Sequence, residues 1–131
     1  MFDFAVMTAT LCFTDHPRKV LAEINRVLRT RGSLGVCIIT RDSTWGAVYT
    51  KKAEGGHVFY RHGHFYTAEE LKKLLAAYSF GVVSVKATLS YGPDAPPRVE
   101  EPADNPDGKG FVCFHAVKLN QAQRAFTGSY A

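Results

Sequence analysis

The first 39 residues constrain the fold most, because they place one amphipathic helix pattern between two buried-strand patterns. Residues 2–7 form an apolar run that only Asp3 interrupts, which is typical of a strand covered on both faces. Residues 34–39 form a second apolar run. Parallel strands need a crossover connection, usually a helix, so this order predicts a βαβ unit.

The segment between these runs carries clear helix signals. Pro17 follows a turn of polar residues and suits the first turn of a helix. Gly32 is expected to end that helix. The apolar stripe that would face the sheet has helical spacing and consists of Val20, Leu21, Ile24, Val27 and Leu28.

The middle of the chain alternates between regular and irregular patterns. Residues 45–49 favour a short helix, whereas residues 51–66 are rich in aromatics, histidines and glycines and predict an irregular covering loop. Thr67 and Glu70 then form a capping box, which predicts the start of another helix. Gly81 is expected to end that helix.

The last part of the chain predicts two strands without a helix between them. Residues 82–89 alternate, with Val83, Val85 and Ala87 expected on one face. A proline-rich loop over residues 90–110 leads to a last strand over 111–119. A connection without a crossover helix predicts an antiparallel pair. We expect one domain over residues 1–118 and a tail over 119–131.

Composition narrows the class of protein. The net charge of +4 comes from cations dispersed on helix surfaces, which indicates a solvated face rather than a nucleic-acid site. No apolar run is long enough to span a membrane. Three cysteines, Cys12, Cys37 and Cys113, lie in apolar stretches, so we expect reduced, buried thiols in a cytoplasmic protein.

Several short motifs together resemble the type 11 class I S-adenosylmethionine (SAM)-dependent methyltransferases. The resemblance covers about residues 2–118, and its motifs are Phe2-Asp3, Leu11, Asp15-x-Pro17, Glu23-x-x-Arg26-Val27-Leu28 and Gly32. It implies an α/β fold, a partial Rossmann-like sheet with the family's strands in the order 4-5-7-6 and the last strand antiparallel. The usual Lys-Pro-Gly-Gly turn is replaced here by residues 29–32.

The resemblance implies SAM as cofactor but leaves most of its binding site outside this sequence. The family's glycine-rich loop and its ribose-binding acidic residue precede the first motif found here. What remains would lie beside the cofactor at the carboxyl ends of the strands, and consists of Met7, Thr8, Ala9, Leu11 and Cys12. Two alternatives are open: Thr8 hydrogen-bonds within its own turn, and Cys12 is a small buried side chain.

A small-molecule acceptor would bind near the aromatic loop. The candidate residues are Arg41, Trp45, Tyr49, Tyr60, Arg61, Phe65 and Tyr66. His62 and His64 are weak candidates for a general base. The alternatives are that the aromatics anchor the loop on the core, and that Arg41 forms a surface salt bridge. The spacing of His57, His62 and His64 fits no common metal site, and we expect none.

If the family's first half is absent, the strand Phe2–Met7 has an unpaired edge. An apolar edge strand is a template for pairing with another chain. We therefore expect a homo-oligomer or a partner that supplies the missing N-terminal half. Three functions compete: part of a methyltransferase, a non-catalytic remnant that acts as a binding or dimerisation module, and a small-ligand binder that uses the aromatic loop alone.

Overall fold

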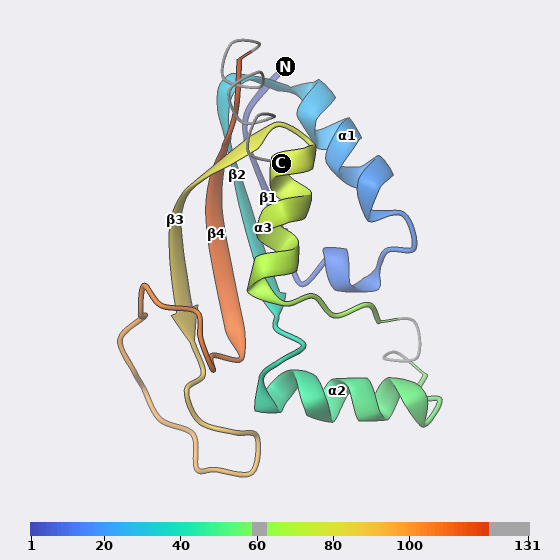
Figure 1. Cartoon of the computed structure of the whole chain (residues 1–131), viewed down its shortest axis with the longest axis vertical. Coiled ribbons are helices and arrows are strands. Elements are labelled where there is room, and N and C mark those ends of the chain that lie inside the picture. The colour runs from blue at the N-terminus through green and yellow to red at the C-terminus, as the bar shows by residue number, and fades with distance from the viewer. Residues whose placement is uncertain (59–62, 121–131) are drawn as a thin grey trace.

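The fold is one mixed sheet with helices packed against it, seen in a computed structural model that describes residues 1–58 and 63–120. The strands are β1 (Phe2–Thr8), β2 (Leu28–Ile39), β3 (Phe80–Thr88) and β4 (Phe111–Lys118). The helices are the 3₁₀ turn η1 (Leu11–Phe13), α1 (Pro17–Val27), α2 (Thr44–Glu54) and α3 (Ala68–Ala77). Figure 1 shows α1 and α3 side by side along the sheet and α2 across its end.

The strand order β1-β2-β4-β3 confirms the predicted partial Rossmann-like sheet. β1 and β2 are parallel and are joined through η1 and α1, which gives the predicted βαβ unit. β4 is antiparallel to both β2 and β3. This direction follows from the loop between β3 and β4, which is not a helical crossover. β1 is left at one edge of the sheet.

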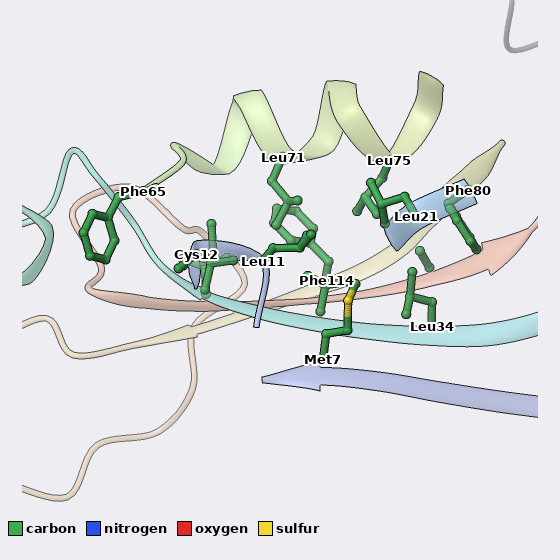
Figure 2. Close-up of a cluster of buried hydrophobic side chains, with 14 of the residues drawn as sticks. Met7, Leu11, Cys12, Leu21, Leu34, Phe65, Leu71, Leu75, Phe80 and Phe114 are labelled. Carbon is green, nitrogen blue, oxygen red and sulfur yellow. The ribbon is translucent and has the colours of Figure 1, made fainter. Parts of the chain in front are cut away.

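The core lies between the sheet and the helices α1 and α3. Leu21 of α1 and Leu71 and Leu75 of α3 are fully buried, and Figure 2 shows them meeting side chains of the sheet such as Leu34 and Phe114. They come from the apolar stripe and the capping-box helix predicted from the sequence. Burial of these side chains provides the main stabilising energy of the fold.

The opposite face of the sheet carries no helix among the described residues. On β1, Phe4 and Val6 remain 59% and 60% exposed. On β2, Leu34, Val36 and Ile38 are buried against the helices, whereas the alternating residues are only half-buried. A sheet with a parallel β1–β2 pair is normally covered on both faces. Phe4 and Val6 are apolar residues on a face that no described helix covers.

Two helix ends differ from the sequence prediction. α1 ends at Val27 and the backbone is already extended at Leu28, so Gly32 lies within β2 instead of ending the helix. A Cβ at Gly32 would lie 2.8 Å from the Arg29 carbonyl oxygen, which explains a glycine at this position in the strand. Likewise, α3 ends at Ala77, Ser79 adopts a left-handed φ of 67°, and Gly81 lies within β3.

Two further predictions are corrected in detail. Residues 51–54 belong to α2 and not to an irregular loop, because the helix that begins at Thr44 continues for a further turn beyond the aromatic residues. The register of β3 shifts between Val82 and Ser84. This bulge moves Val83 out of the alternation, and its side chain is 60% exposed.

The prediction of three reduced, buried thiols is wrong for two of them. Cys37 of β2 and Cys113 of β4 are directly opposite each other in the antiparallel pair and form a disulfide. Sequence position alone gave no indication of this register. Cys12 is free and fully buried, as predicted. The cytoplasmic location stays a prediction.

Across residues 1–58 and 63–120, none of the helices has the length and apolar character needed to cross a bilayer.

Candidate functional site

The turn after β1 lies at the carboxyl ends of the parallel strands, where α/β sheets bind ligands. β1 ends at Thr8, and Ala9 has a left-handed φ of 55°. The Ala9 N–H donates to the Cys37 carbonyl oxygen at 2.8 Å, which holds the turn against β2. The chain then enters η1, so the predicted cofactor-binding segment is a tight and well-anchored turn.

Most side chains of this segment face the core. Met7, Leu11 and Cys12 are 5%, 1% and 0% exposed, and Figure 2 shows them between α3 and the sheet. The side chain of Thr8 is exposed, and its carbonyl oxygen accepts from the Thr10 hydroxyl at 3.3 Å. A ligand at this edge would therefore meet the Thr8 hydroxyl and the backbone of the turn, whereas the three buried residues hold that backbone in place.

The chemistry of Cys12 agrees with a structural role. Burial raises the pKa of its thiol, because the charged thiolate is disfavoured away from water. The thiol therefore stays protonated and unreactive at neutral pH.

An aromatic cluster lies beside η1 and connects it to α2. Tyr49 of α2 stacks on Phe65, with ring centroids 6.2 Å apart and an interplanar angle of 19°. Phe65 also meets Phe13 edge to face, at 6.4 Å between centroids. Trp45 lies 6.5 Å from Tyr49 on the same helix. The predicted acceptor-site aromatics Trp45, Tyr49 and Phe65 are thus brought together, and Phe65 contacts Phe13 of η1, which follows the turn predicted to bind the cofactor.

Trp45 has a clear packing role. Its indole N–H donates to the Tyr91 carbonyl oxygen at 2.7 Å. Its ring also fills the space that a side chain at Gly110 would occupy, since a Cβ there would lie 2.5 Å from the ring. Trp45 therefore fixes α2 to the two ends of the loop between β3 and β4.

Arg41 forms the surface salt bridge that the sequence left as one alternative. Its guanidinium pairs with both carboxylate oxygens of Glu70, one at 3.0 Å, and donates to the Phe65 carbonyl oxygen at 3.3 Å. The Arg41 N–H also donates to the Tyr66 carbonyl oxygen at 3.0 Å. These bonds tie the end of β2 to the segment before α3 and use most of the donors of Arg41.

The phenol of Tyr66 is unsuited to act as a base at neutral pH. Burial raises its pKa, and the nearby carboxylate of Glu70 adds to that effect through charge repulsion. The side chain therefore remains a neutral hydrogen-bonding group at this position.

His64 lies between the aromatic segment and the turn after β1. Its backbone N–H donates to the Cys12 carbonyl oxygen at 2.5 Å, and its Nε2 lies 3.3 Å from the Asp15 carboxylate. Tyr60, Arg61 and His62 lie outside the described residues. Among the residues that are described, no three His, Cys, Asp or Glu side chains come together as a metal site.

A pocket of about 310 Å³ adjoins the aromatic cluster. It is lined by Arg41, Thr50, Ala53, Glu54, Gly63 and Phe65. The sequence analysis did not identify Thr50 and Glu54, because it placed the end of α2 before them. Their spacing of four residues would have revealed a shared helix face if the helix had been extended through Glu54.

Comparison with known proteins identifies the family. A model of the methyltransferase domain matches residues 1–85. The chain belongs to the class I SAM-dependent methyltransferases. This confirms the resemblance given by the sequence motifs and agrees with the observed strand order.

Two groups of relatives support this assignment. An uncharacterized protein of Mycobacterium tuberculosis is 36% identical over 118 residues, and one of Methanocaldococcus jannaschii is 31% identical over 118 residues. The crystal structure of a SAM-dependent methyltransferase, possible histamine N-methyltransferase, from Thermotoga maritima is 35% identical with a TM-score of 0.81. It covers 89% of this chain.

The chain spans only part of each of these relatives. The matches cover 88% of this chain but 41% of the mycobacterial protein, and 90% of this chain but 57% of the archaeal one. The matched part is 56% of the Thermotoga chain. The Burkholderia thailandensis 1,6-didemethyltoxoflavin-N1-methyltransferase, crystallised with S-adenosylhomocysteine, shares the fold with a TM-score of 0.57 at 19% identity, covering 91% of this chain and 44% of its own.

Proposed function

We propose that this chain is part of an enzyme that transfers a methyl group from SAM to a small-molecule acceptor. The observation that carries this proposal is the TM-score of 0.81 at 35% identity with the SAM-dependent methyltransferase of Thermotoga maritima. Fold alone does not determine function. Here the family model also matches residues 1–85, which include the turn after β1 and the aromatic segment before α3.

The residues present fit one wall of a cofactor site. SAM, when bound, supplies a methyl group on a sulfonium that a nucleophilic acceptor can attack. In this chain the exposed Thr8 hydroxyl and the backbone at Ala9 offer polar contacts at the carboxyl end of β1. Buried Leu11 and Cys12 keep that edge rigid, which suits a site that works by positioning.

The acceptor would bind over the aromatic cluster. Tyr49 and Phe65 offer stacked rings beside η1, and Arg41 and Tyr66 lie at the same strand end. Trp45 supports this surface from α2, and Tyr60, Arg61 and His62 remain proposed contributors outside the described residues. Of the two candidate bases, His64 is the one that the structure describes, and its Nε2 lies 3.3 Å from the Asp15 carboxylate. The name of the Thermotoga relative supports a small nitrogen-containing acceptor.

We further propose that a second α/β segment completes the sheet at β1. Its support is the unpaired edge of β1 together with exposed Phe4 and Val6 on the helix-free face. That segment is the N-terminal half of a methyltransferase domain, or a second copy of this chain. The same surface also supports the alternative of a non-catalytic dimerisation module.

The test is co-expression with the N-terminal part of the Thermotoga methyltransferase that this chain does not match. We expect the two to co-purify and to bind SAM in a calorimetric titration, whereas this chain alone binds weakly. Val6→Lys should prevent association, because it places a charge on the β1 surface. Val83→Lys is the matched control, since Val83 is equally exposed at 60% but lies on β3 at the other edge.

Two results would overturn these proposals. A co-purified complex that fails to bind SAM would contradict the proposed methyl transfer and favour the non-catalytic dimerisation module. A chain that stays monomeric, with Val6→Lys no different from the parent, would remove the proposed completion of the sheet at β1.

A further inference from the structure

The pocket beside α2 carries polar groups that the fold itself does not use. The Thr50 hydroxyl is buried, and it has no hydrogen-bond partner in the described part of the chain. A buried hydroxyl without a partner costs free energy, so its retention calls for an explanation. Thr50 lines the pocket, but its hydroxyl oxygen has almost no accessible surface, so a ligand supplies the missing hydrogen bond only if the pocket wall shifts slightly on binding.

The second unused group is a carboxylate on the same helix face. Glu54 lies four residues after Thr50, so both side chains project from one side of α2 into the lining of the pocket. Within residues 1–58 and 63–120, no salt bridge involves Glu54. Arg41, the cation of the lining, is already neutralised by Glu70. Among the described residues that line the pocket, Glu54 is therefore the charged side chain without an ion-pair partner, and its charge is negative.

Besides these two polar groups, the pocket has an aromatic side. Phe65 lines the pocket and stacks on Tyr49. The Tyr49 ring already has the ammonium of Lys52 5.5 Å from its centroid, so this stack accepts a cation on one face. Phe65 also contacts Phe13 at the end of η1. A ligand in the pocket thus lies one ring away from the turn that we assign to the cofactor.

We propose that this pocket binds the ammonium group of a small amine, with Glu54 as counter-ion and the Thr50 hydroxyl as hydrogen-bond acceptor. The volume of about 310 Å³ fits a compact ligand of this kind. As a statement about the methyl acceptor, the inference rests on the proposed function. A protonated ammonium has no lone pair and cannot attack the methyl group of SAM. It therefore serves as the anchor. The acceptor then carries a second, neutral nucleophilic atom that reaches past Phe65 toward η1.

The test uses 2-phenylethylamine as probe and this chain without cofactor. We expect saturable binding in a calorimetric or chemical-shift titration, and binding at least fivefold weaker for the neutral analogue 2-phenylethanol. Glu54→Gln should weaken amine binding by about fivefold, as for an exposed ion pair near 1 kcal/mol. Glu101→Gln is the matched control, because Glu101 is an exposed carboxylate in the loop after β3, and it should leave binding unchanged.

Thr50→Val separates binding from folding. The variant removes a hydroxyl that has no protein partner among the described residues, so its melting temperature should not fall. Its affinity for the amine should fall by about threefold. Equal affinity for amine and alcohol, or unchanged amine affinity in both Glu54→Gln and Thr50→Val, would overturn the proposal.

These measurements distinguish the pocket from the proposed function. Because the titration contains no SAM, amine binding that depends on Glu54 supports the pocket even if the completed enzyme transfers no methyl group. Methyl transfer by the completed enzyme that is unaffected by Glu54→Gln would instead support the function and overturn the amine anchor.

Discussion

The ammonium of Lys118 donates a hydrogen bond to the carbonyl oxygen of Leu28, 2.7 Å away and 90 residues earlier in the chain. The same ammonium donates to the Asn25 carbonyl oxygen at 2.5 Å. The last carbonyls of a helix lack partners within the helix and carry the negative end of its dipole. Lys118 of β4 therefore completes the C-terminal end of α1 and joins the last strand to the βαβ unit.

Replacing Lys118 with methionine should destabilise the fold. The substitution retains the apolar stem but leaves one buried and one partly buried carbonyl oxygen without their donor, at an expected cost of about 2 kcal/mol. Urea unfolding measures the change. Lys86→Met is the control, since Lys86 pairs with Asp104 on the exposed surface, and its loss should cost less than about 1 kcal/mol. Equal effects of the two substitutions would contradict a capping role for Lys118.

Gly46, near the start of α2, should be highly sensitive to substitution. A Cβ at this position would lie 1.9 Å from the Thr40 carbonyl oxygen and 2.8 Å from Arg41 backbone atoms. Gly46→Ala therefore forces the start of α2 away from the end of β2. We expect destabilisation of about 3 kcal/mol or more, at the upper end for a single substitution, and loss of probe binding at the pocket.

Gly55, at the other end of the same helix, provides the comparison. It has a negative φ of −77°, and a Cβ there would meet only ordinary contacts, at 3.5 Å or more. Gly55→Ala should therefore change the free energy of unfolding by less than about 1 kcal/mol. A Gly46→Ala variant as stable as Gly55→Ala would show that α2 can shift freely relative to β2.

The sequence predicted the elements and their order because these depend on local patterns. The spacing of Leu21 and Leu71 with their neighbours defines helical stripes. Thr67 caps α3 by accepting from the Glu70 N–H at 3.1 Å, which is one half of the predicted capping box, whereas the Glu70 carboxylate pairs with Arg41. The sequence predicted that α1 and α3 end at Gly32 and Gly81, whereas the two helices end earlier, at Val27 and Ala77. There, tertiary contacts such as those of Lys118 decide where the helix stops, and no local pattern records them.

The candidate site was predicted in part. Family motifs pointed to the turn after β1, and the spacing of Trp45 and Tyr49 placed these aromatic residues on one helix. Neither pattern indicated the ion pair of Arg41 with Glu70, which joins residues 29 positions apart. The pairing of Cys37 with Cys113 depends on the register of β2 and β4. Register is set by packing across the whole sheet, so it was not accessible from the cysteine spacing.

Thiol counting should reflect this pairing. Under denaturing but non-reducing conditions, one cysteine should react with a thiol reagent, because only Cys12 is free. After reduction all three should react. Mass spectrometry of the labelled chain gives the count, and the Cys12→Ala variant should give zero before reduction. Three reactive thiols without reductant would mean that Cys37 and Cys113 are not bonded in the purified protein.

Cys12 should make stability depend on pH in the alkaline range. Burial raises the pKa of its thiol in the folded state above the ordinary value of a cysteine. The unfolded chain therefore loses this proton at lower pH than the folded chain does. By linkage, the stabilisation that Cys12 contributes is complete below the unfolded pKa and is lost as pH rises through the folded pKa.

The slope is at most about 1.4 kcal/mol for each pH unit in that window. Urea unfolding of the parent and of Cys12→Ala, at about pH 8 and about pH 10, isolates this contribution because other titrating groups are shared. The difference in unfolding free energy between the two proteins should decrease at the higher pH. A difference that stays constant or increases would mean that the thiol is not held away from water in the folded state, and that the turn after β1 is looser than its hydrogen bonds to Cys37 and His64 imply.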